Sequence, residues 1–158
     1  MKRNYALLIG NSAYGNSTTS NKRDPSFRPL NSPVTDVQDL AAILKHSEIG
    51  NYQITKLLDA TTSEIENAIH EFYDGKKSDD LLVFYFSGHG FVGTDNELYL
   101  AGIDTWRVKD HTAVSAHDLV RKVDQCKSRR KVIILDCCYS GRVMRGMKSA
   151  PVSTRIPT

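Results

Sequence analysis

Short apolar segments alternate with longer amphipathic segments along the chain. The short ones, at residues 5–9, 52–58, 81–86 and 132–135, are rich in β-branched or aromatic residues, which predicts strands. Between them, the segments at about 33–45, 63–73 and 117–125 place apolar residues at helical spacing, which predicts helices. The clearest helix start is Thr61, followed three residues later by Glu64, a pattern that predicts a capping box.

This order of strands and helices predicts the fold class. Parallel strands joined by helical crossovers give an α/β sandwich. The third and fourth strands are apolar without polar alternation, as expected where helices cover both faces of a sheet. Residues 11–31 form a long polar connection, and connections of that length are usually functional or disordered. At 158 residues the chain fits one domain with a substantial hydrophobic core.

Composition and charge narrow the class of protein. Hydrophobic residues make up 40% of the chain and charged residues 25%, which is typical of globular domains. The net charge of +3 conceals a basic C-terminal part, because residues 127–158 hold eight Lys or Arg and a single acid, Asp136. No aromatic residue beyond Tyr139 is interleaved with these charges and no groove-binding motif precedes them, so we expect no direct nucleic-acid partner.

The length of the apolar runs and the number of cysteines predict where in the cell the protein is located. The apolar runs are far shorter than the roughly 20 residues of a membrane span, so we expect no membrane partner. The N-terminal residues imitate the start of a signal peptide, but the apolar stretch is short and no cleavage site follows. Three cysteines, two of them adjacent, are a poor disulfide framework and favour a reducing, cytoplasmic location.

Two segments carry candidate chemistry because each directly follows a predicted strand. His89 lies in the Ser-Gly-His-Gly segment at 87–90, and Cys138 lies in Asp-Cys-Cys-Tyr-Ser-Gly at 136–141. Active sites of open parallel sheets form beyond the carboxyl ends of strands. If the third and fourth strands are neighbours, their ends lie about 5 Å apart, and His89 and Cys138 face each other.

A histidine beside a cysteine suits nucleophilic catalysis, because the imidazole generates the thiolate and later protonates the leaving amine. The amides of Gly90 and Cys138 are predicted to hold the oxyanion. Taken singly, a histidine between glycines is more often a turn residue, and a cysteine such as Cys126 is usually a core residue. Their shared position at two strand ends favours catalysis. Zinc is disfavoured, because adjacent cysteines alternate across a strand and no Cys-x-x-Cys pair is present.

These motifs resemble the caspase and metacaspase family of cysteine proteases. The likeness rests on residues 6–11, on Asp36 at a helix start, and on the segments at 84–90 and 135–141, in the family's order and spacing. It is strongest to the prokaryotic caspases associated with effector and defence modules. The resemblance implies a caspase-like three-layer sandwich with a mainly parallel sheet flanked by helices, and a cysteine endopeptidase acting on a protein substrate. It also implies a prokaryotic defence or cell-death setting.

No cofactor and no metal are expected. Calcium dependence occurs in some metacaspases through acidic clusters, but Asp95, Glu97 and Asp104 form no recognisable ligand loop. A solvated hairpin and a strand-end cap are the ordinary interpretation of these acids.

Two departures from the family affect specificity and completeness. Caspases place glutamine where this chain has an acid, Asp136, and the likeness to metacaspases implies that Asp136 and Asp36 line the first specificity pocket and receive Arg or Lys. The alternative for Asp36 is a helix-start acid favoured by the helix dipole. The family also has a smaller portion after the cysteine strand. This chain is therefore the large fragment of a processed enzyme, a shortened form of one, or an unusual member, and a small-subunit portion or chain is its expected partner.

The basic C-terminal part is predicted to be a processing segment. We expect a catalytic domain over residues 1–141 and a flexible basic loop over 142–158, because Gly, Ser, Ala and Pro separate its charges. An enzyme that accepts basic residues would find its own cleavage sites there; alternatively, the charges only solubilise the loop. The candidate sites are Arg142, Arg145, Lys148 and Arg155.

Two other functions compete with the protease. A caspase-fold scaffold without activity would bind partners, but it would have no need of both His89 and Cys138. A flavodoxin-like ligand-binding domain would share the sheet. It is disfavoured because no Gly-rich phosphate loop follows the first strand.

Overall fold

The computed structural model describes residues 3–15 and 24–137, and Cys138 and the predicted processing sites lie outside these ranges. The helices are α1 (Pro33–Lys45), α2 (Thr62–Tyr73) and α3 (Ala116–Gln125), with a short 3-10 helix at Asp110–Thr112. The strands are β1 (Asn4–Gly10), β2 (Gln53–Leu58), β3 (Leu81–Ser87), β4 (Gly90–Val92), β5 (Leu98–Leu100), β6 (Val114–Ser115) and β7 (Arg130–Asp136).

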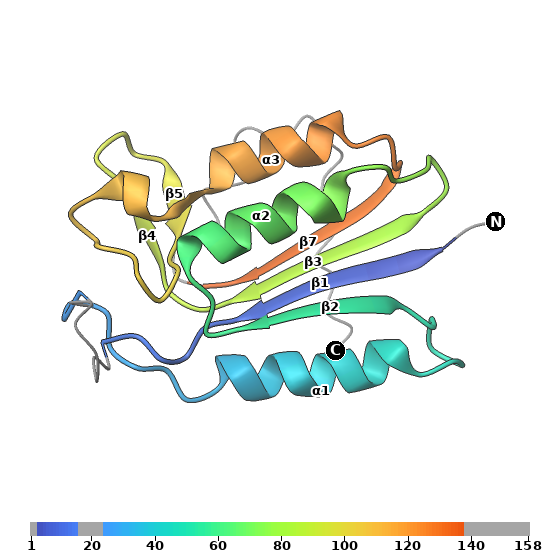
Figure 1. Ribbon diagram of the computed structural model, residues 1–158, viewed down its shortest axis with the longest axis horizontal. Coiled ribbons are helices and arrows are strands. Elements are labelled where there is room, and N and C mark those ends of the chain that lie inside the picture. Colours follow the sequence, from blue (N-terminus) through green and yellow to red (C-terminus); the bar gives the residue numbers. More distant parts are fainter. Residues whose placement is uncertain (1–2, 16–23, 138–158) are drawn as a thin grey trace, which may run out of the picture.

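The predicted α/β sandwich is confirmed. Strands β2, β1, β3 and β7 form a parallel sheet in that order. Figure 1 shows α1 on one face of this sheet and α2 with α3 on the other, so the layers are helix, sheet and helices. All four strands point the same way, and the short strands β4 and β5 lie beyond their carboxyl ends. This edge of the sheet is where the predicted site residues belong.

The core around the parallel sheet has two parts because β1 is buried on both faces. Leu7 and Ile9 pack with α2 and α3, whereas Ala6 and Leu8 pack beneath α1. Side chains alternate between faces along a strand, so an apolar run serves both layers at once. This explains why β1 and β3 show no polar alternation in the sequence.

Helix boundaries follow the predicted signals closely. The helix predicted at 33–45 is α1, with Pro33 in its first turn. At α2, the Glu64 amide donates to the Thr61 hydroxyl and the Glu64 carboxylate accepts from the Thr61 amide, so both bonds of the capping box are present. These hydrogen bonds also hold the pKa of Glu64 below its ordinary value. In the described part of the chain, no helix is long and apolar enough to cross a membrane.

Strand β7 differs from the prediction that helices cover both of its faces. Burial alternates along it, and Val132 and Ile134 are each 43% exposed. In the register of the sheet they lie beside Val83 and Tyr85, on the α1 side. Helix α1 packs on β1, β2 and β3 and so does not extend over β7. In the described residues, β7 is therefore an edge strand with one apolar face open.

A second sheet, not foreseen from the sequence, adjoins the first. Strands β4, β5 and β6 pair antiparallel in that order. None exceeds three residues, which is too short for a recognisable alternation. The sheet starts one residue after His89 and thereby fixes the course of the chain as it leaves β3.

Candidate active site

The carboxyl ends of β3 and β7 lie side by side, as predicted (Figure 1). Ser87, the last residue of β3, is in register with Asp136, the last residue of β7. The Gly88 amide donates to the Asp136 carbonyl at 3.3 Å and ties the two strand ends together. His89 follows at once, and Cys138 is the second residue after Asp136, just outside the described range. The segments of the predicted dyad thus leave the sheet from adjacent strands.

Cys137 packs into the interior. Its side chain is half-buried and contacts the core beneath α2 and α3, the same core that Leu135 and Ile133 contact. Alternation along the strand accounts for this, because residues 133, 135 and 137 share one face. The packing gives Cys137 a structural role and disfavours it as a nucleophile.

The imidazole of His89 is held at its outer nitrogen by a backbone carbonyl. Nε2 lies 2.8 Å from the carbonyl oxygen of Arg28. Because a carbonyl only accepts, Nε2 must carry the hydrogen, and in the neutral ring Nδ1 is then the atom that can accept a proton. The imidazole is therefore set up as a base through Nδ1.

The carbonyl of Arg28 comes from a loop anchored on both sides. Asp24 is buried and accepts hydrogen bonds from the amides of Ser26 and Arg107, at 2.8 and 2.6 Å. Burial opposes ionisation, but these hydrogen bonds prevail and hold the pKa of Asp24 below its ordinary value. At the far end, the Leu30 amide donates to the Ser12 carbonyl at 3.0 Å. The polar connection predicted at 11–31 thus contributes to the site, although none of its residues was expected there.

Glycines flank His89 for two different reasons. A Cβ at Gly88 would lie 2.6 Å from the Tyr14 hydroxyl oxygen, so no side chain fits there. Gly90 pairs with Leu100 in the antiparallel ladder, and the Ala101 amide donates to the His89 carbonyl at 2.9 Å. This pattern makes Gly90 and Leu100 a non-hydrogen-bonded pair, so the ladder leaves the Gly90 amide unused.

The two carboxylates predicted to bind substrate both act on Tyr85. This tyrosine extends from β3 on the α1 side, and its hydroxyl donates to Asp136 Oδ2 at 3.5 Å. Burial, with contributions from the negative charges of Asp136 and Asp36, raises the pKa of Tyr85 above its ordinary value. Asp36 comes from the first turn of α1. Asp136 therefore contacts this phenol beside the β3–β7 junction, and the negative charge of Asp36 also acts on it.

Comparison with known proteins now decides the family. The family model described as the caspase domain matches residues 3–157. The chain belongs to the caspase family. This confirms the resemblance seen in the motifs and places the caspase domain among cysteine peptidases.

Individual relatives are more distant. The human mucosa-associated lymphoid tissue lymphoma translocation protein 1 is 25% identical over 138 residues, which cover 87% of this chain and 15% of that protein. Its mouse homolog is 24% identical over the same shares. The crystal structure of protein GSU0716 from Geobacter sulfurreducens superposes with a TM-score of 0.65 at 21% identity, covering 86% of this chain and 50% of that one. The caspase domain thus spans about 15% of the length of these curated relatives, and the solved structure supports the fold.

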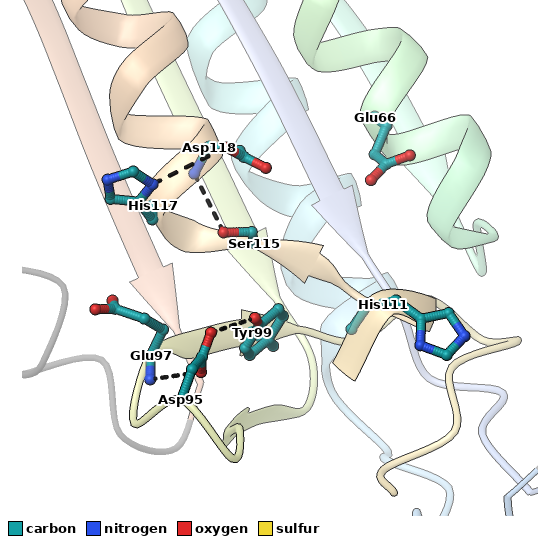
Figure 2. Close-up of a pocket in the computed structure, with 9 residues that line it drawn as sticks. Glu66, Asp95, Glu97, Tyr99, His111, Ser115, His117 and Asp118 are labelled. Carbon is teal, nitrogen blue, oxygen red and sulfur yellow. Dashed lines mark hydrogen bonds and ion pairs between the residues drawn. The ribbon is translucent and has the colours of Figure 1, made fainter. Parts of the chain in front are cut away.

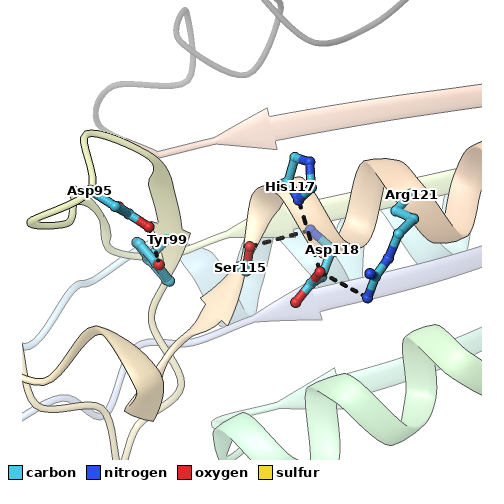
Figure 3. Close-up of polar contacts among 6 residues, drawn as sticks. All are labelled: Asp95, Tyr99, Ser115, His117, Asp118 and Arg121. Atoms are coloured by element: carbon cyan, nitrogen blue, oxygen red, sulfur yellow. Dashed lines mark hydrogen bonds and ion pairs between the residues drawn. The ribbon is translucent and has the colours of Figure 1, made fainter.

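A cavity of about 530 Å³, which His89 does not line, lies between the β4–β5 hairpin, β6 and the helices α2 and α3 (Figure 2). The Tyr99 hydroxyl donates to Asp95 at 2.7 Å, a bond that raises the pKa of Tyr99 to about 12 and helps to lower that of Asp95. On α3, Asp118 is paired with Arg121 at 3.0 Å and approaches His117 at 3.9 Å (Figure 3).

This cavity includes the acidic hairpin considered for calcium. Across the described residues, no three His, Cys, Asp or Glu side chains are arranged so that they could hold a metal ion. Of the acids that line the cavity, Asp95 accepts hydrogen bonds from Glu97 and Tyr99, and Asp118 is paired with Arg121. The expectation of no metal stays a prediction.

Proposed function

We propose that this caspase domain is a cysteine endopeptidase that cleaves proteins after Arg or Lys, with Cys138 as nucleophile and His89 as its base. The observation that carries the proposal is the 2.8 Å contact between His89 Nε2 and the Arg28 carbonyl. It commits one ring nitrogen to the protein and leaves Nδ1 for the thiol. A histidine whose only role was to form a turn would not need a fixed tautomer.

The chemistry follows from this arrangement. Nδ1 takes the proton of the Cys138 thiol, and the thiolate attacks the peptide carbonyl carbon to form a tetrahedral intermediate. The Gly90 and Cys138 amides stabilise its oxyanion. The imidazolium protonates the leaving amine as the C–N bond breaks, and a water molecule, deprotonated by Nδ1, then hydrolyses the thioester to release the acid and the thiol.

Preference for a basic residue rests on Asp36 and Asp136. Asp136 contacts the Tyr85 phenol beside the β3–β7 junction, and the negative charge of Asp36 acts on the same phenol. A guanidinium or ammonium group would pair with them, whereas an acidic substrate residue would be repelled. This is a stronger case for Asp36 than helix capping alone, because its charge reaches Tyr85 on the neighbouring strand.

A second portion is proposed to complete the enzyme. Among the described residues, β7 is the edge strand of the parallel sheet. The face of β7 that carries Val132 and Ile134 is not covered by a helix. Exposed apolar edge strands pair readily with further strands. The solved relative is about twice as long as the matched region, which covers 50% of it. A small-subunit portion or chain that pairs with β7 would extend the substrate groove.

Substrate preference tests the function directly. We expect the natural full-length polypeptide to cleave peptide reporters with Arg or Lys before the scissile bond roughly 100-fold faster than matched reporters with Asp, measured as kcat/KM. Faster cleavage after Asp would overturn the specificity. No cleavage of any reporter, together with no reaction with a thiol-directed peptide inhibitor, would favour the inactive scaffold instead.

Self-processing is expected in the basic segment that follows the nucleophile. Arg142, Arg145, Lys148 and Arg155 lie outside the described residues, and the prediction rests on their sequence context and on the proposed specificity. Expressed as wild type, the natural polypeptide should show new termini after one or more of these residues, and Cys138→Ala should show none. Mass spectrometry of both proteins makes the comparison. Identical termini in both would assign the cutting to another protease.

The proposed defence or cell-death setting is supported by motif resemblance alone.

A further inference from the structure

Tyr14 contacts His89 closely but has no part in the chemistry described above. Its side chain is only 1% exposed. The hydroxyl accepts a hydrogen bond from the His89 amide at 3.1 Å and donates one to the Ala101 carbonyl at 2.9 Å. One phenol therefore connects the chain leaving β3 with the chain leaving β5.

The ring of Tyr14 also contacts the imidazole. The two centroids are 4.6 Å apart with the planes at 66°, an edge-to-face arrangement. The Phe27 ring approaches the same imidazole at 5.1 Å. Phe27 is the residue before Arg28, whose carbonyl holds Nε2. The imidazole is thus bounded by two aromatic rings and one hydrogen bond, and few rotations about its side-chain torsions remain open.

The local sequence is adapted to the Tyr14 hydroxyl. Gly88 has no room for a Cβ, because that atom would lie 2.6 Å from the hydroxyl oxygen. Burial raises the pKa of Tyr14 far above its ordinary range, so the hydroxyl keeps its proton and remains a donor at any working pH. A buried hydroxyl is costly unless paired, and this one is used both as donor and as acceptor.

We propose that Tyr14 is a positioning residue for His89: its hydroxyl fixes the His89 backbone, and its ring, with that of Phe27, keeps Nε2 on the Arg28 carbonyl so that Nδ1 remains the nitrogen that accepts a proton. The proposal rests on the proposed function for its catalytic consequence. Its structural content, a single imidazole tautomer in a fixed orientation, can be measured independently of activity.

The test compares Tyr14→Phe with Tyr99→Phe in the natural full-length polypeptide. Tyr99 is a matched control, because it also loses a hydroxyl hydrogen bond, to Asp95 at 2.7 Å, and its ring stacks on Phe91 rather than on His89. We expect Tyr14→Phe to lower kcat roughly 10- to 100-fold with KM within about two-fold, because a small misplacement of a catalytic group is costly. Tyr99→Phe should stay within about two-fold of wild type in both constants.

A second readout follows the ring itself. In protein labelled with ¹⁵N-histidine, the nitrogen chemical shifts of His89 should report the Nε2–H tautomer in the wild type and in Tyr99→Phe. A mixture of tautomers is expected in Tyr14→Phe. Phe27→Leu, which removes the other ring without removing a hydrogen bond, should also give a mixture and serves if Tyr14→Phe fails to fold.

The outcomes are decisive in both directions. If Tyr14→Phe, or Phe27→Leu in its place, keeps a single Nε2–H tautomer and wild-type kcat, the proposal is overturned. Equal losses of kcat in Tyr14→Phe and Tyr99→Phe would overturn it too, because they would indicate general destabilisation. If the wild type cleaves nothing, the proposed function fails, yet the tautomer measurement still decides whether Tyr14 positions His89.

Discussion

Replacing either Cys138 or His89 by alanine should abolish peptide cleavage, with kcat/KM falling by roughly 10⁴-fold or more, since members of a catalytic pair act as a unit. Without the imidazole, only a few per cent of the thiol is ionised at neutral pH. Without the thiol, the imidazole has nothing to activate. The measurement is kcat/KM for an Arg reporter, with folding of each variant checked by thermal unfolding.

The other two cysteines provide the matched controls for this prediction. Cys137 packs into the core beneath α2 and α3, and Cys126 is buried at the end of α3. Cys137→Ala and Cys126→Ala should lose some stability and keep most of the activity, because neither thiol is needed for chemistry. An inactive but folded Cys137→Ala, beside an active Cys138→Ala, would show that the nucleophile is wrongly assigned.

Asp136→Asn should remove most of the preference for Arg over uncharged residues, and Asp36→Asn should weaken it as well. Each charge-assisted hydrogen bond to a guanidinium contributes about 1.5–3 kcal/mol, so kcat/KM for an Arg reporter should fall roughly 10- to 100-fold per carboxylate. Cleavage of a reporter with an uncharged residue should change little, because the substitution keeps the size of the side chain.

A control variant that removes a distant negative charge distinguishes direct contact between Asp136 and the substrate from an effect of the protein's overall charge. Asp118→Asn removes the same unit charge from the exposed acidic cavity, where Asp118 pairs with Arg121 rather than with substrate (Figure 3). It should leave the Arg preference unchanged. A drop in preference equal to that of Asp136→Asn would mean that overall charge sets the specificity, and the pocket assignment would be wrong.

The parts of the fold that the sequence predicts well are those governed by burial over several residues. Strands β1 and β3 are buried on both faces, and their uninterrupted apolar runs indicate this directly. The capping box at Thr61 and Glu64 is a local interaction and is found as predicted. The sequence left the neighbouring position of β3 and β7 as a condition, and the structure meets it and brings the two motif segments together.

The parts that were not predicted depend on contacts between distant segments. Strands β4 to β6 have two or three residues each, so neither periodicity nor propensity identifies them. The alternating burial of β7 depends on where α1 lies, which its own apolar sequence does not reveal. Tyr14 meets His89 across 75 positions of the chain. Tyr14 and Phe27, the two aromatic residues of the polar connection, were the available signal that this connection folds back on the core.

The hydrogen bond between His89 and the Arg28 carbonyl has a genetic consequence. The group that selects the imidazole tautomer belongs to the peptide backbone, so every amino acid at position 28 supplies it equally. Substitutions of the Arg28 side chain should therefore preserve this contact, and a scan of single substitutions should find position 28 tolerant. What selection must preserve is the path of the loop, held by Asp24 at one end and by the Leu30 amide at the other. Substitutions that disturb the contact between His89 and the Arg28 carbonyl should therefore occur at the two anchors of the loop, and not at Arg28 itself.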